Sequence, residues 1–236
     1  HFRPLLSYVG AGLSSTKELS RRQHSVMPSG VRWLQDAAAT IDTERRSVTL
    51  ASGSVVTYRD VVLTPGSEPD WDALPGSAQA MLSPSASTNY VVDLAPKTWE
   101  LIKALRKGRA VFTLPDGPAP CPGAGQKILY MACDYWRSQG VLDDIEVTLV
   151  TADADISENS HIASRLHVWA RRYGIRVLAA SRVDQVDPTA QTLQVTGSNG
   201  TETLAYDFWH LTPTHKAQPW IEAAGLSSVP AAGYVD

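Results

Sequence analysis

The stretch that decides the fold is residues 109–151. It contains RAVFTL (109–114), GQKILYMACDYWRS (125–138) and IEVTLVT (145–151). The first and third stretches are typical of strands, and the second has the apolar spacing of a helix. A second helical pattern covers 160–173. Strands that alternate with helices predict a parallel sheet covered by helices. Residues 147–150 are almost continuously apolar or β-branched, as expected for a strand buried on both faces. We therefore expect a Rossmann-like βαβαβ unit.

An internal repeat extends this architecture along the chain. Residues 30–65 contain β-runs, a Gly-containing hairpin and a closing β-run, and residues 174–213 repeat that order. Each copy predicts a β-meander followed by a return strand, at 60–63 and at 207–211. Both return strands end at Thr-Pro, where proline cannot continue a central strand. The expected fold class is α/β, with two tandem Rossmann-like dinucleotide-binding folds that carry β-meander insertions, the first of them incomplete.

The repeat also predicts the domain organisation. Residues 1–95 are expected to hold the meander and return strand of the partial first domain, and 96–215 to form the second Rossmann-like domain. Residues 216–236 are expected to return toward the first domain. The chain begins at His1 and carries no signal-peptide pattern, so we expect both ends to belong to a longer protein.

Composition excludes several classes of protein. The 43% hydrophobic and 19% charged residues are typical of a globular protein, and no apolar run approaches the roughly 20 residues that cross a bilayer. The net charge of -3, with basic residues only in short pairs, argues against a nucleic-acid partner. The six histidines lack metal-ligand spacing, and the acidic loop at 153–158 lacks the glycine of a calcium loop, so no metal site is expected.

A dinucleotide site needs Gly-x-Gly-x-x-Gly between the first strand and the first helix, so that the backbone can approach the pyrophosphate. In the second unit this crossing, residues 115–125, reads PDGPAPCPGAG, with four prolines and a cysteine. The glycines at 10 and 12 are no substitute, because no strand precedes them and the third glycine is missing. The second unit therefore has NAD-type topology but is not expected to bind NAD, and its reductant must come from elsewhere.

Cys121 is the candidate reactive residue of that crossing. It directly precedes a predicted helix, whose dipole favours the thiolate, and Lys127 adds a positive charge one to two turns on. The flanking prolines cannot donate hydrogen bonds and favour an extended loop. The alternative is a small apolar side chain in an ordinary loop. Cys133 lies inside the helix, where core packing is the better interpretation, and a disulfide between the two cysteines is not expected.

Tandem folds of this kind resemble the flavin-containing pyridine nucleotide-disulfide oxidoreductase superfamily. Within it, PCPGAGQKILY at 120–130 is similar to the segment CAGAPQKIMY of sulfide:quinone oxidoreductases, particularly the mitochondrial type. Pro122 and Gly125 replace that family's alanine and proline, and Cys133 replaces an acidic or polar residue. Further stretches match the family along nearly the whole chain: YVGAG (8–12), PSGVRW (28–33), NY to KTW (89–99), HLTP (210–213), AAG (223–225) and GYVD (233–236).

The resemblance implies an enzyme that oxidises hydrogen sulfide. Cys121, aided by the charge of Lys127, would be one of two cysteines that form a disulfide or sulfur-bridged pair at FAD. Sulfide opens the pair and leaves a persulfide, electrons pass through FAD to a ubiquinone-type quinone, and the persulfide sulfur goes to a small sulfur acceptor. The partner cysteine, the flavin fingerprint and the membrane-associating region are expected outside this chain.

The resemblance also implies flavin contacts near Ala38 and from the turn that contains Thr64 and Gly66. For location it implies a peripheral protein of the mitochondrial inner membrane, or of the cytoplasmic membrane in a bacterium, and it is compatible with a homo-oligomer. Two alternatives stay open. One is an NAD(P)H-dependent flavoprotein reductase, against which the proline-rich crossing argues. The other is a non-catalytic, structural remnant of a flavoprotein.

Overall fold

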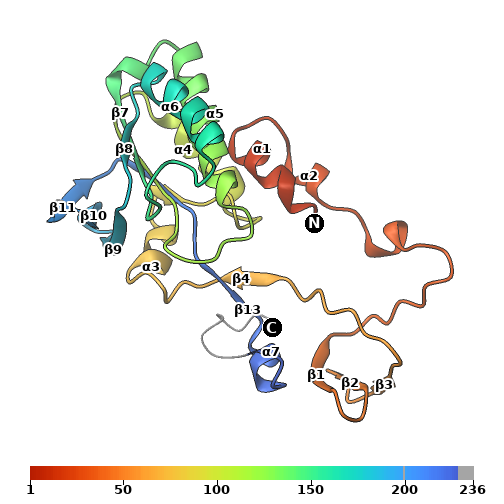
Figure 1. The fold of residues 1–236 in the computed structure, drawn as a ribbon. Helices are drawn as coiled ribbons and strands as arrows, with labels where there is room; N and C mark the ends of the chain where they lie inside the picture. The colour runs from red at the N-terminus through yellow and green to blue at the C-terminus, as the bar shows by residue number, and fades with distance from the viewer. Residues whose placement is uncertain (199, 228–236) are drawn as a thin grey trace. The chain divides into compact units, whose positions relative to one another are not determined.

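A five-stranded, fully parallel sheet lies at the centre of residues 70–214, as the βαβαβ pattern predicts. The computed structural model describes residues 1–198 and 200–227, drawn in Figure 1. The chain alternates strands and helices through this region, which confirms the predicted α/β class. In spatial order the strands are β5 (Ala86–Ser87), β12 (Phe208–Leu211), β6 (Gly108–Thr113), β7 (Ile145–Val150) and β8 (Arg176–Leu178).

Different elements cover the two faces of this sheet, and the side chains of β6 show why. Ala110 and Phe112 pack with the helices, whereas Val111, which points the opposite way, packs with a second cluster. The helical face is covered by α4 (Ala95–Ala104), α5 (Pro122–Ser138) and α6 (Ser160–Arg172). Trp136 of α5 is fully buried in this layer, and its indole N–H donates to the carbonyl of Ile102, 2.8 Å away.

The opposite face is covered by a meander and a short helix. The meander consists of the antiparallel strands β9 (Arg182–Asp187), β10 (Thr192–Gly197) and β11 (Gly200–Ala205), and the helix is α3 (Ser77–Leu82). Leu193 and Val195 of β10 pack in one apolar cluster with Trp209 of β12. Because both faces are covered, the sheet strands are apolar on both sides.

The chain divides into two compact units at residues other than those expected from the repeat. One unit combines His1–Ser20 with Asp70–Thr214, and the other combines Arg21–Pro69 with the segment that begins at His215. The stretch 70–95, which we expected in the first domain, contains α3 and β5, and β5 pairs with β12 of the central sheet. These pairings tie the stretch to the second Rossmann-like fold.

The second unit contains the other meander of the repeat. Strands β1 (Ala38–Asp42), β2 (Ser47–Leu50) and β3 (Val55–Thr57) form an antiparallel sheet, while β4 (Ser67–Pro69) pairs with β13 (His215–Ala217). Helix α7 (Pro219–Ala223) contacts β1.

The return strand expected at 60–63 is absent, so this part of the prediction is wrong. Its counterpart β12 is buried between β5 and β6. Val62, in contrast, is 86% exposed, and residues 61–66 have no regular secondary structure. A strand needs neighbouring strands to satisfy its backbone, and the described part of this unit supplies none at 60–63. The repeat also breaks at 31–35, which form no strand although β8 stands at the matching place.

Near the N-terminus, α1 (Leu6–Gly10) packs against α4 and α5. A Cβ at Gly10 would lie 2.9 Å from Cδ1 of Ile128, so glycine permits this close approach. Among the described residues, no helix combines the length and apolarity needed to cross a bilayer. The remaining short helices are η1 (Arg3–Leu5), α2 (Thr16–Leu19), η2 (Gln23–Val26) and η3 (Leu142–Asp144).

Candidate functional site

Cys121 is the N-cap residue of α5, the position expected from the sequence. Its backbone is extended, with φ −157° and ψ 90°, because the helix begins directly after it at Pro122. The residue is exposed and its thiol is free. Cys133 is also a free thiol but is completely buried, and burial raises its pKa above the ordinary value. Cys133 is therefore a packing residue, and Cys121 is the accessible sulfur.

A tyrosine distant in sequence holds the backbone at this point. The Tyr90 hydroxyl donates to the carbonyl oxygen of Cys121 at 2.6 Å and accepts the N–H of Gly125 at 3.1 Å. The N–H of Ala124 donates to the same Cys121 carbonyl at 3.0 Å. The sequence analysis did not single out Tyr90 as a site residue, since the contact crosses 31 positions and no local pattern reveals it.

These contacts use two of the donors with which a helix N-terminus usually binds phosphate. Pro122 has no N–H, and the N–H groups of Ala124 and Gly125 donate within the protein. Gly125 serves packing as well, because a Cβ there would lie only 2.1 Å from Oγ1 of Thr212. The N–H groups of Ala124 and Gly125 are therefore engaged within the protein at the start of α5.

A cavity of about 850 Å³ opens beside α5, at the carboxyl ends of β6 and β7. This is the crevice where ligands bind in open parallel α/β sheets. Apolar side chains such as Ile156 and Leu166 line it together with Asp116, Asp153 and Glu158, against a single basic residue, Lys127.

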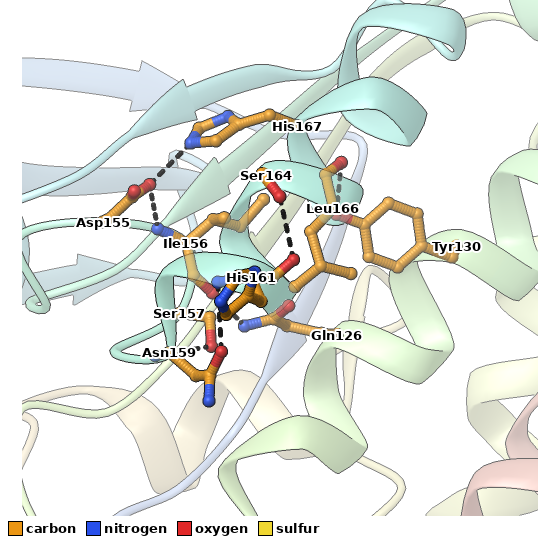
Figure 2. A network of polar contacts seen from close by, with 10 residues as sticks. All are labelled: Gln126, Tyr130, Asp155, Ile156, Ser157, Asn159, His161, Ser164, Leu166 and His167. Atoms are coloured by element: carbon orange, nitrogen blue, oxygen red, sulfur yellow. Dashed lines mark hydrogen bonds and ion pairs between the residues drawn. The ribbon is translucent and has the colours of Figure 1, made fainter.

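The loop between β7 and α6, which forms one wall of the cavity, is fixed by polar contacts (Figure 2). The Gln126 amide donates to the carbonyl of Ile156 at 2.7 Å. Asp155 Oδ1 accepts the Ile156 N–H at 2.6 Å and lies 2.6 Å from His167 Nε2. These two contacts, the backbone one first, lower the pKa of the Asp155 carboxyl. The wall is therefore braced by contacts within the protein.

Asn159 caps α6 in the same loop. Its side-chain oxygen accepts the N–H of His161 at 3.1 Å (Figure 2). The same oxygen accepts the N–H of Ile162 at 3.2 Å. The first donors of the second helix that borders the cavity are thus also used internally. The carboxylates of the lining disfavour a phosphate, and several first donors of both helices are already used within the protein.

Lys127, the second predicted catalytic residue, is exposed and lines this cavity. It follows Cys121 by six positions, which at 3.6 residues per turn places it about 120° away around α5. The described lining residues do not include Cys121. The two predicted residues therefore share one helix end but not one face.

The three predicted flavin contacts lie in the other compact unit. Ala38 opens β1 beside an irregularity of its register with β2, and its side chain is exposed. Thr64 and Gly66 are exposed in an irregular segment. Gly66 has φ +74°, and nothing lies within 4 Å of the place where a Cβ would be. The backbone of this turn is thus open to a bound molecule, so the residues fit the proposed contact with FAD.

Comparison with solved structures defines the class of protein. The chain superposes with a TM-score of 0.65 on a ferredoxin reductase from Rhodopseudomonas palustris, at 20% identity, over 96% of this chain and 53% of that one. On the sulfide:quinone oxidoreductase of Aquifex aeolicus the TM-score is 0.85, at 16% identity, over 99% of this chain and 55% of that one. The chain therefore has the Rossmann-type fold of flavoprotein reductases.

Sequence comparison narrows the class. The chain is 28% identical over 238 residues to the mitochondrial sulfide:quinone oxidoreductase of Mus musculus, which covers all of this chain and 52% of the relative. No protein-family model matches. The chain is thus similar in sequence to a sulfide:quinone oxidoreductase and has the fold of one, and it spans about half the length of the curated relative.

Proposed function

We propose that this chain forms the middle part of an enzyme that oxidises hydrogen sulfide and delivers the electrons to a ubiquinone-type quinone. The observation that carries the proposal is the accessible free thiol of Cys121 at the start of α5, within the stretch similar to sulfide:quinone oxidoreductases. The likeness along the whole chain supports the same substrate class. The internally used donors of α5 support a reductant other than NADH.

In this mechanism Cys121 is one sulfur of a disulfide or sulfur-bridged pair, and its partner is a cysteine outside this chain. For the disulfide form, HS⁻ attacks the pair, the S–S bond breaks, one cysteine becomes a persulfide and the other leaves as a thiolate. The helix N-terminus at Cys121 stabilises negative charge that develops on its sulfur. Lys127 adds positive charge at the same helix end. A small thiol or similar nucleophile then removes the persulfide sulfur.

Removal of the persulfide sulfur leaves both cysteines as thiolates, and the two electrons released when their sulfur–sulfur bond re-forms need an acceptor. FAD, when bound, would supply that two-electron chemistry, with quinone as the final acceptor. Within this chain we assign its contacts to the backbone at Ala38, Thr64 and Gly66, where the polypeptide is accessible. Because the curated relative is named mitochondrial, we place the enzyme at the mitochondrial inner membrane as a peripheral protein, with a bacterial cytoplasmic membrane as the alternative.

Substitution of the two cysteines tests the role of Cys121. In the flavin-loaded enzyme, Cys121→Ser should abolish sulfide-dependent quinone reduction, because serine cannot form the sulfur–sulfur bond. Cys133→Ala is the matched control, since Cys133 lies in the core and should be dispensable for turnover. Retained activity in Cys121→Ser would remove Cys121 from the mechanism. An intact mass and a visible spectrum of the same sample establish the length of the chain and its flavin content.

An NAD(P)H-dependent flavoprotein reductase is the second candidate, and the 850 Å³ cavity at the dinucleotide-binding crevice favours it. The occupied N–H groups at the start of α5 argue against it. Oxidation of NADH by the flavin-loaded enzyme, at a rate comparable with sulfide oxidation, would decide for this alternative.

A further inference from the structure

The side chain of Tyr90 bridges two backbone groups at the start of α5. Its hydroxyl donates to the Cys121 carbonyl at 2.6 Å and accepts from the Gly125 N–H at 3.1 Å. A helix N-terminus leaves its first N–H groups without intrahelical partners, and its N-cap residue is usually fixed by its own side chain. Cys121 makes no such side-chain cap. Tyr90 takes over this function from a distant segment.

The anchor is itself rigid, because the residue before it is tied into the core. Asn89 is 2% exposed, and its amide nitrogen donates to Oγ of Ser7 in α1 at 3.0 Å. Its side-chain oxygen lies 2.9 Å from Nε2 of His210, a fully buried residue of β12. Burial lowers the pKa of His210 to about 3, so this ring is neutral. Through Asn89, the backbone at Tyr90 is fixed to the central sheet.

The hydroxyl of Tyr90 is held in its protonated form by burial. Burial raises the pKa of Tyr90 above its ordinary value, and contacts with Thr212 and the Gly125 N–H lower it only in part. At neutral pH the hydroxyl of Tyr90 is therefore a donor to the Cys121 carbonyl. The prolines on both sides of Cys121 cannot donate hydrogen bonds, whereas the Cys121 carbonyl accepts one from Tyr90.

We propose that Tyr90 is a positioning residue for the redox sulfur: by binding the carbonyl of Cys121 and the N–H of Gly125, it fixes the direction in which the Cys121 side chain leaves the helix start. The inference rests on the proposed function of Cys121. Sulfur exchange requires a near-linear approach of the attacking sulfur, so displacement of the cysteine backbone by about 1 Å is expected to slow turnover by one to two orders of magnitude.

Tyr90→Phe is the test, because it removes the hydroxyl and keeps the ring. Tyr173→Phe is the control. Tyr173 follows α6 and is largely buried, and its hydroxyl donates at 3.2 Å to Asp134 of α5, twelve positions after Pro122 at the helix start. In the flavin-loaded enzyme, kcat for sulfide-dependent quinone reduction should fall at least tenfold in Tyr90→Phe, with KM for quinone unchanged. Amide exchange of Gly125 should accelerate by about three- to tenfold as one hydrogen bond is lost. Tyr173→Phe should change neither quantity.

Two results would overturn the proposal. One is unchanged kcat in Tyr90→Phe. The other is an equal fall of kcat in Tyr173→Phe, which would indicate a general loss of stability. Measured beside Cys121→Ser, the outcomes separate: an inactive Cys121→Ser with a fully active Tyr90→Phe refutes the positioning role alone, whereas an active Cys121→Ser refutes the proposed function and this inference with it.

Discussion

Replacement of Gly125 by alanine perturbs the contact between α5 and the end of β12. In an exposed helix, Gly→Ala stabilises by up to about 1 kcal/mol, because alanine loses less backbone entropy on folding. At position 125 the added methyl group would lie 2.1 Å from Oγ1 of Thr212 and 3.0 Å from Cδ2 of Leu114. Thr212 must rotate or the helix must shift, at a cost of about 1–3 kcal/mol that is typical of an overpacked core.

The same helix turn contains a matched control. A Cβ at Gly123 meets nothing within 4 Å. Gly123→Ala should therefore keep the entropic gain and stabilise the unit by up to about 1 kcal/mol. For Gly125→Ala the clash outweighs that gain, so the net effect is destabilisation by about 1–2 kcal/mol. The two variants differ in sign although the substitution is chemically identical.

Urea unfolding followed by tryptophan fluorescence measures this difference, because Trp136 and Trp209 are fully buried in the unit concerned. The midpoint should fall for Gly125→Ala and rise or stay constant for Gly123→Ala at an unchanged slope. The double variant Gly125→Ala with Thr212→Ala should recover part of the loss, since it removes the Oγ1 atom. Equal urea midpoints for the two single variants would refute the close packing of α5 against Thr212.

Two further predictions concern titration and thiol access. Burial lowers the pKa of His210 from 6.5 to about 3, so below pH 6.5 the unfolded chain binds a proton that the folded protein does not. The contribution of the neutral ring to the free energy of unfolding is fully present above pH 6.5. It falls as the pH decreases toward 3, by up to about 1.4 kcal/mol per pH unit. Urea titrations between pH 4 and 6 give the free energy of unfolding at each pH, and this free energy should change less with pH in His210→Gln than in the unmodified protein. An equal pH dependence in the two proteins would contradict the neutral, buried ring. In the 236-residue chain taken alone, where Cys121 has no partner sulfur, N-ethylmaleimide should add once to the folded protein, at Cys121, and twice in urea, because Cys133 is 0% exposed. Rapid double labelling of the folded chain would show that Cys133 is accessible.

Local sequence patterns predict the central sheet well. Residues 109–114 and 145–151 alternate or run apolar in the way that a doubly covered strand requires, and β6 and β7 form at those places. The return strand at 60–63 has a similar pattern but does not form, because strand formation depends on neighbouring strands that a local pattern does not reveal.

The site is predictable only in part. The helix signal at 125–138 and the proline-rich crossing place Cys121 at a helix start, and the structure has it as the N-cap residue. Tyr90 has no such signal, because its contact with Cys121 exists only after β5 has been placed in the sheet. The same holds for Gly125. A side chain is excluded there by Thr212, which is remote in sequence.

The position of β12 also constrains how the protein is made. This strand pairs with β5 on one side and β6 on the other, so the sheet has a gap until residues 208–211 are available. On the ribosome, β6, β7 and β8 emerge first and expose an unpaired apolar edge while about thirty more residues are synthesised. We expect this interval to be the time at which the nascent chain depends most on chaperones.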